Sequence, residues 1–369
     1  SIYTIVPLVT QRFDVSTKIG VAQTTLSSFG MLVVVLLGYK LEAIFLSQLL
    51  ISIIFTLVYR NYSQKILPIA KLKFQWHKKE IIKCYKFGLV AYISNISGQT
   101  LSYFDKLIIP IFINPASLSY YSLSGSVASK STGLISSLTN ILFPLTSSLN
   151  GGGDKEKIGK LYIRSFRLTS ILSASIAFSI CFFSYKIMQY WLSEDIALNT
   201  YKILIILALT YFIISIYNPL SSFLLGLGKT KILAFFSVLM AMVNIVFLFI
   251  LLPKFGIMGA AIAYLISMLP TVYMVFYTER TILNLNNRFS FYVIFYLKLF
   301  FTGAIFYVFS KIFIYPFIVS LSTLLVLGPF SVLVYLLLYK IFGFFEEDDL
   351  VLFKNFGFMF FCRVKRIIR

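Results

Sequence analysis

Residues 232–252 form an apolar run that contains no charged side chain and is bounded by Lys231 and Lys254. A helix rises ~1.5 Å per residue, so a run of this length crosses a hydrocarbon layer ~30 Å thick. Backbone polar groups inside lipid have to be paired within the element itself, and an α-helix pairs them. The run therefore predicts a transmembrane helix. Because similar runs recur along the chain, they limit the fold to an all-α polytopic membrane protein.

Composition and charge favour the same class. The chain of 369 residues is 59% hydrophobic and only 12% charged, whereas roughly a quarter of the residues of a soluble domain are charged. The net charge of +20 does not indicate a nucleic-acid partner, because most of the 33 Lys and Arg residues fall in loops on one predicted side of the membrane. By the positive-inside rule this side is cytoplasmic. One histidine and three scattered cysteines predict neither a metal site nor a disulfide framework.

The apolar runs predict ten complete crossings and, at residues 1–11, the end of a further one. A long basic loop at 60–86 separates the early helices from the others, and a polar loop is expected at 278–290. Residues 154–168 alternate basic and apolar positions with a helical period, which predicts either a helix lying on the cytoplasmic leaflet or a solvated helical face. The expected crossings are 19–39, 43–59, 87–113, 117–148, 169–190, 201–226, 232–252, 257–277, 291–313 and 317–340.

The connection after residue 252 contains Gly256 and Gly259, which allow a sharp reversal of the chain. The small residues Gly259-Ala260-Ala261 also predict a close helix contact.

These features form an ordered motif. Gly228-Lys229-Thr230-Lys231 comes first, Asn244 lies in the next helix, and Pro253-Lys254-Phe255-Gly256-Ile257 and Gly259-Ala260-Ala261-Ile262-Ala263 follow. The motif resembles the second half of polysaccharide flippases of the O-antigen or capsule type, in the multidrug/oligosaccharidyl-lipid/polysaccharide exporter superfamily. The resemblance implies a two-lobe, inverted-V helical bundle whose first lobe is truncated here.

A faint internal repeat agrees with two lobes, since Lys40-Leu41-Glu42-Ala43 and Lys254-Phe255-Gly256-Ile257 each join two helices. The expected domains are the remainder of the first lobe at 1–59, a basic cytoplasmic linker at 60–86, a six-helix second lobe at 87–277, two additional helices at 278–341, and a cytoplasmic tail at 342–369.

Charged residues inside predicted crossings are candidates for a substrate cavity, because such groups are costly in lipid. Asp105 and Lys106 are adjacent and cannot share one helix face; with Phe104 they resemble the acid–base pair on the first helix of the flippases' second lobe. Lys130 lies within a Ser/Gly-rich helix, where a cation would attract a diphosphate. The alternatives are an interfacial position for Asp105 and a snorkelling lysine at position 130.

Five side-chain amides are further cavity candidates, and as an alternative they form hydrogen bonds between helices. They are Asn95, Gln99, Asn140, Asn218 and Asn244. Tyr103, Tyr120 and Tyr121 are weaker candidates for stacking on sugar rings, since the chain contains 24 tyrosines.

The resemblance implies a flippase that moves a polyprenyl-diphosphate-linked oligosaccharide across the bacterial inner membrane by alternating access, for O-antigen, capsule or exopolysaccharide synthesis. The implied partners are the lipid-linked oligosaccharide, membrane lipid, a polysaccharide polymerase and glycosyltransferases, with no cofactor. No enzyme signature is present in the sequence, so we expect a non-enzyme. The alternatives are a multidrug/cation antiporter, a membrane-embedded glycosyltransferase or polymerase, and a non-transporting scaffold.

Overall fold

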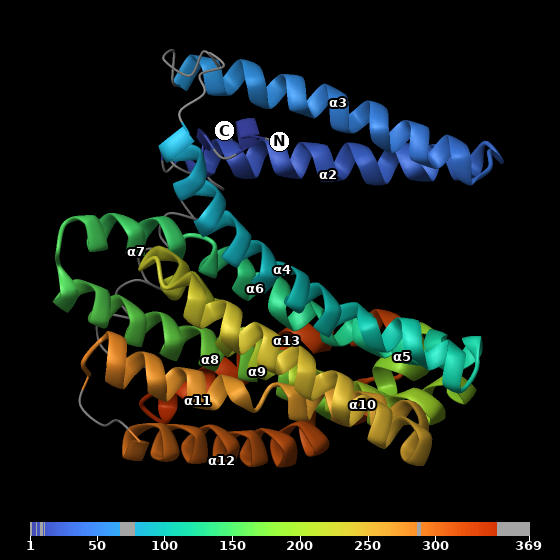
Figure 1. Cartoon of the computed structure of the whole chain (residues 1–369). Coiled ribbons are helices and arrows are strands. Elements are labelled where there is room, and N and C mark those ends of the chain that lie inside the picture. Colours follow the sequence, from blue (N-terminus) through green and yellow to red (C-terminus); the bar gives the residue numbers. More distant parts are fainter. Residues whose placement is uncertain are drawn as a thin grey trace, which may run out of the picture. The chain divides into compact units, whose positions relative to one another are not determined.

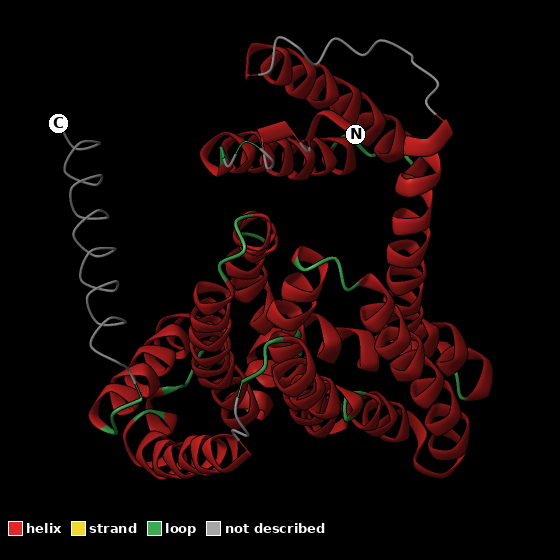
Figure 2. Cartoon of the chain, turned by 60° about the vertical axis from the view of Figure 1, so that its left-hand side comes forward, coloured by secondary structure: helices red, strands yellow, loops and turns green. Residues whose placement is uncertain are grey.

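The computed structural model describes residues 2–4, 6–7, 10, 12–66, 78–285 and 289–344. Within these ranges every regular element is a helix (Figures 1 and 2). Seven of these helical segments are long and apolar enough to cross a membrane. The elements are η1 (Ile2–Thr4), α2 (Phe13–Leu36), α3 (Leu41–Ile66), α4 (Lys78–Phe112), α5 (Pro115–Ala128), α6 (Lys130–Thr139), α7 (Leu142–Gly151), α8 (Lys155–Trp191), α9 (Glu194–Gly226), α10 (Thr230–Ser267), α11 (Pro270–Tyr277), η2 (Thr278–Ile282), α12 (Phe289–Phe313), η3 (Tyr315–Phe317) and α13 (Leu321–Ile341).

The chain divides into two compact units, Ser1–Cys84 and Tyr85–Arg369. The finer division expected from the sequence stays a prediction. Expected features at the basic loop 67–77 and the tail 345–369 lie outside the described residues.

The first unit is a hairpin of α2 and α3 (Figure 1). The helices meet through a small buried cluster of Val15, Ile19, Ile51, Phe55 and Tyr59. Most of the other apolar side chains of the two helices are exposed, which suits contact with lipid.

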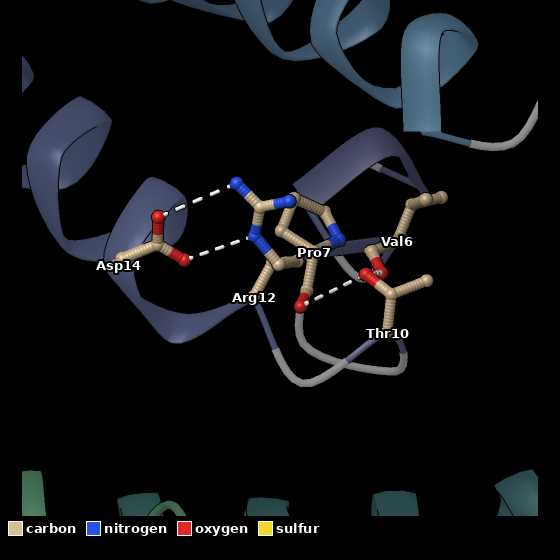
Figure 3. A network of polar contacts seen from close by, with 5 residues as sticks. All are labelled: Val6, Pro7, Thr10, Arg12 and Asp14. Atoms are coloured by element: carbon tan, nitrogen blue, oxygen red, sulfur yellow. Dashed lines mark hydrogen bonds and ion pairs between the residues drawn. The ribbon is translucent and has the colours of Figure 1, made fainter.

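Before α2 the chain is held by short polar contacts (Figure 3). The Thr10 hydroxyl donates to the carbonyl oxygen of Val6 at 2.9 Å, and Arg12 Nε lies 3.2 Å from Asp14 Oδ1. Both side chains of this ion pair are about half exposed, so the pair orients the start of α2 more than it stabilises the unit.

The second unit is built around α8 and α9, which pack against each other along their lengths. Small residues make the close approach possible, because Ser170, Ser173, Ala174 and Ala177 on α8 are buried. Helices α5, α6, α7 and α10 all contact α9. This central helix therefore organises the core of the unit.

The single helix predicted at 117–148 is wrong, because three shorter helices, α5, α6 and α7, occupy this stretch. Pro144 lacks the amide hydrogen that would bond to the carbonyl of Asn140, so the chain breaks between α6 and α7. At the start, the Asn114 side chain accepts a hydrogen bond from the Ser117 amide at 2.8 Å and begins α5.

The prediction of a separate helix at 154–168 is also wrong, since this segment and the following crossing form the single helix α8 of 37 residues. Asp154 caps it by accepting from the Lys157 amide at 3.1 Å. Arg167, which the pattern placed on an exposed basic face, is only 7% exposed. The continuous core contact with α9 overrides the apparent break in the pattern.

The predicted reversal after residue 252 is confirmed. Gly256 has φ +57° and ψ −145°, a conformation that glycine adopts without steric cost. A Cβ atom added to Gly259 would lie 2.2 Å from the Leu251 carbonyl oxygen. A straight helix would separate these two residues by ~12 Å, so the chain folds back here. The close contact predicted for Ala260 and Ala261 is confirmed, because both are fully buried.

Candidate functional site

A buried carboxylate joins α4 to α5. Asp105 is 1% exposed and accepts a hydrogen bond from the hydroxyl of Tyr121, which is 2% exposed. The backbone amide of Lys106 donates to Asp105 Oδ1 at 2.7 Å. These donors offset the cost of placing a polar acid in an apolar interior. Asp105 therefore lies inside the helical bundle, and its depth in the membrane stays a prediction.

Two further tyrosines complete this group, which we call the Asp105 cluster: Asp105, Tyr121, Tyr211 and Tyr264. Tyr211 on α9 and Tyr264 on α10 lie close enough to Tyr121 to interact with it electrostatically. Their rings meet edge to face with centroids 6.2 Å apart. The cluster thus draws side chains from α4, α5, α9 and α10 into one polar centre. Tyr211 and Tyr264 could not be predicted as members of this cluster, because nothing local distinguishes them among the 24 tyrosines.

Lys106 points away from this cluster, as expected for a neighbour of Asp105 on one helix. Its Nζ lies 4.8 Å from the centre of the Tyr103 ring, a cation–π contact. Tyr103 is 55% exposed. Asp105 and Lys106 are therefore not an ion pair, and the lysine is on the outer side of α4.

The remaining polar candidates fall into an exposed set and a buried set. Asn95, Gln99 and Tyr103 recur every four residues and form an exposed stripe on α4, which we call the α4 stripe. Lys130 and Asn140 are exposed at the start and just past the end of α6.

The buried set is on the other long helices. Asn218 on α9 is half-buried, next to Pro219 inside the helix. Asn244 on α10 is fully buried, and neither its Oδ1 nor its Nδ2 has a hydrogen-bond partner in the protein. A buried amide without a partner costs about 1–3 kcal/mol. The interhelical hydrogen bond considered for Asn244 is absent from the described part of the chain.

Comparison with known proteins identifies the family. Residues 9–197, about half of the chain, match the family described as "Polysaccharide biosynthesis protein". The chain belongs to this family. This membership agrees with the resemblance of its motif to polysaccharide flippases.

Curated relatives agree with this assignment. A Shigella flexneri protein named as an O-antigen transporter is 23% identical over 193 residues, covering 50% of this chain and 46% of the relative. A Haloferax volcanii protein named as the low-salt glycan biosynthesis flippase Agl15 is 25% identical over 183 residues. The match covers 50% of this chain and 39% of the relative. The chain thus spans less than half the length of these relatives.

Solved structures show the fold. The lipid II flippase MurJ in an inward closed conformation matches 87% of this chain and 66% of its own, at 18% identity and a TM-score of 0.62. A MATE transporter in a bent conformation matches 78% of this chain and 64% of its own, at 13% identity and a TM-score of 0.58. These likenesses confirm the predicted all-α fold of a polytopic membrane protein.

The chain contains a second buried acid, at a position where a polar loop was expected. Glu279 lies in the π-helix η2 and is 4% exposed, and the Tyr292 hydroxyl of α12 donates to it. The sequence contains no signal for this burial, since Glu279 follows the apolar run next to Arg280. Neither acid belongs to a metal-ligand group, because the described ranges hold no cluster of three His, Cys, Asp or Glu side chains.

Proposed function

We propose that this chain takes part in moving a polyprenyl-diphosphate-linked oligosaccharide across the bacterial inner membrane by alternating access. The observation that supports it best is a buried polar centre, the Asp105 cluster, inside the helical bundle of a chain that belongs to a polysaccharide biosynthesis family. Polar groups at such positions mark substrate pathways more often than structural sites. The function is transport, with no chemical step assigned to the protein.

In the proposed mechanism the polar glycan crosses along the α4 stripe while the polyprenyl tail stays in lipid. Amide and hydroxyl groups replace the water that the sugars lose, and Tyr103 offers an aromatic face for a sugar ring. Lys130 is exposed, so its ammonium is available to hold the diphosphate through charge-assisted hydrogen bonds. A polymerase and glycosyltransferases would act before or after this step.

The test is export of surface polysaccharide by the complete reading frame in a strain that lacks its flippase. Lys130→Ala is expected to reduce export at normal protein level, and Lys130→Arg to retain part of it, because the charge persists. Lys254→Ala is the matched control, since this exposed lysine follows the long first segment of α10. Normal export by Lys130→Ala would remove this residue from the proposed site.

The buried acid supports a second candidate, a multidrug/cation antiporter. Asp105 is the kind of group that exchanges a cation or proton inside a membrane. On this alternative, Asp105→Asn abolishes cation-coupled drug efflux and leaves polysaccharide export intact. Loss of export without any efflux activity in the parent protein favours the flippase.

A further inference from the structure

A pocket of about 630 Å³ lies where three turns of the second unit come together. One turn joins α7 to α8, the second joins α9 to α10, and the third follows η2. Each turn contains a residue with a left-handed backbone: Gly153, Gly228 and Asn284, with φ between +51° and +73°. We call it the three-turn pocket.

The charge of the three-turn pocket is positive. Lys155, Lys160 and Lys229 line it, with Glu156 as the acidic residue among the lining side chains. Glu156 forms an ion pair with Lys160, and the Lys160 Nζ lies 2.6 Å from the Glu156 Oε1. Lys155 and Lys229 form no ion pair with any residue in the described ranges. Two uncompensated cations thus face one pocket.

The rest of the lining is of two kinds. Asn150 and Asn284 bring side-chain amides that can donate hydrogen bonds. Ile158, Ile163, Leu227 and Leu283 form an apolar wall beside them. A ligand that fits both parts has an anionic oxygen-rich end and an apolar continuation.

The side of the membrane on which the three-turn pocket lies further limits the chemical class of its ligand. The turns before α8 and after α9 belong to the basic side of the chain, which the positive-inside rule places at the cytoplasm. Both turns adjoin helices long enough to cross the membrane. Anionic phospholipids of the cytoplasmic leaflet present their phosphates at this level and attract nearby lysines.

We propose that the three-turn pocket binds the phosphate headgroup of an anionic phospholipid from the cytoplasmic leaflet. Lys155 and Lys229 hold the phosphate oxygens, the amides of Asn150 and Asn284 donate to the headgroup, and the apolar wall contacts the glycerol and the start of an acyl chain. This site is separate from the Asp105 cluster and does not depend on the proposed transport.

The test uses the full chain in bilayer discs of a zwitterionic phosphatidylcholine, titrated with phosphatidylglycerol. Lipid retained on the protein is counted by native mass spectrometry, and the thermal unfolding midpoint is followed in parallel. We expect Lys155→Ala/Lys229→Ala to bind phosphatidylglycerol about tenfold more weakly, because two charge-assisted contacts are lost. Lys155→Arg/Lys229→Arg is expected to bind nearly as the parent does.

The matched control is Lys157→Ala. Lys157 lies in the same first turn of α8, but its Nζ pairs with Asp154 Oδ2 at 2.7 Å and it does not line the pocket. Its loss should leave lipid binding unchanged. Should the double variant fail to fold, Lys229→Ala is compared with Lys231→Ala, an exposed lysine two residues further on.

Inorganic pyrophosphate, added alone and then together with phosphatidylglycerol, tells whether the pocket prefers a soluble phosphate or a membrane lipid. Weak competition by pyrophosphate together with saturable phosphatidylglycerol binding supports the proposal. Equal lipid binding by the parent and the double alanine variant overturns it, as does binding of pyrophosphate with no selective binding of phosphatidylglycerol.

Discussion

The Tyr121 hydroxyl donates a hydrogen bond to the Asp105 carboxylate, and this contact ties α4 to the α5–α9 core of the second unit. Both side chains are almost completely buried. Asp105 is therefore held from two sides, by this phenol and by the backbone amide of Lys106.

Removing the phenol should destabilise the protein, and the effects of changing Tyr121 and Asp105 should not be additive. Tyr121→Phe leaves a buried acid with one donor fewer, at a cost of about 1–3 kcal/mol in the free energy of unfolding. In the double variant Asp105→Asn/Tyr121→Phe the cost should be smaller than the sum of the two single changes. Denaturant unfolding in detergent measures all three values. Tyr120→Phe, at a half-buried neighbour, is the control, and equal effects at positions 120 and 121 would contradict the assignment.

A methyl group at position 259 should disrupt the reversal of α10. In Gly259→Ala the new Cβ would meet the Leu251 backbone at 2.2 Å, and backbone cannot move aside as a flexible side chain can. We expect a loss of at least about 1–3 kcal/mol in unfolding free energy. The control is Gly98→Ala in α4, where nothing lies within 4 Å of the added atom. A thermal midpoint that is equal for both variants would mean that the turn relaxes without cost.

The two ends of α9 should be reached from opposite sides of the membrane. Its 33 residues extend over ~50 Å, enough to cross a bilayer. In a background without the native cysteines, a membrane-impermeant thiol reagent added outside intact cells should label Glu194→Cys and not Lys229→Cys. Both parent residues are exposed, so accessibility within the protein does not separate them. The reverse pattern would overturn the cytoplasmic assignment of the basic loops.

The first turn of α8 should loosen in acid because of its cap. The Lys157 side chain hydrogen-bonds to Asp154 and lowers the pKa of that carboxyl below its usual 3.8. A lowered folded-state pKa means that the contribution to stability is present above pH 3.8 and is lost as pH falls through the lower value. Hydrogen exchange of the amides at 155–158, corrected for intrinsic rates, should show this loss.

The variant Asp154→Asn distinguishes the effect of the carboxylate charge from that of the capping hydrogen bond. The amide oxygen still accepts from the Lys157 backbone, but it does not titrate. Protection in this variant should therefore stay constant through the same acidic range. If the parent and the variant lose protection together, another group is responsible.

Part of the candidate site could be predicted from the sequence. Asp105 stood out because a charged residue inside an apolar helix is costly, and its separation from Lys106 followed from the helical period. Its partner Tyr121 could not be selected, since that contact depends on how α4 and α5 pack. Glu279 was missed for the same reason: its burial depends on Tyr292, which the sequence places after an expected loop.

The sequence by itself determined the all-α membrane architecture and the reversal at Gly256, because lipid accepts only internally paired backbone and a positive φ favours glycine. It did not determine the crossings: ten were expected, whereas seven helical segments of the described residues are long and apolar enough to span, and one of them, Thr230–Ile282, covers two of the expected crossings. The break between α6 and α7 has a local cause in Pro144. Only the tertiary structure decided that 155–191 is one continuous helix and which side chains meet around Asp105, because those outcomes depend on contacts between residues far apart in the chain.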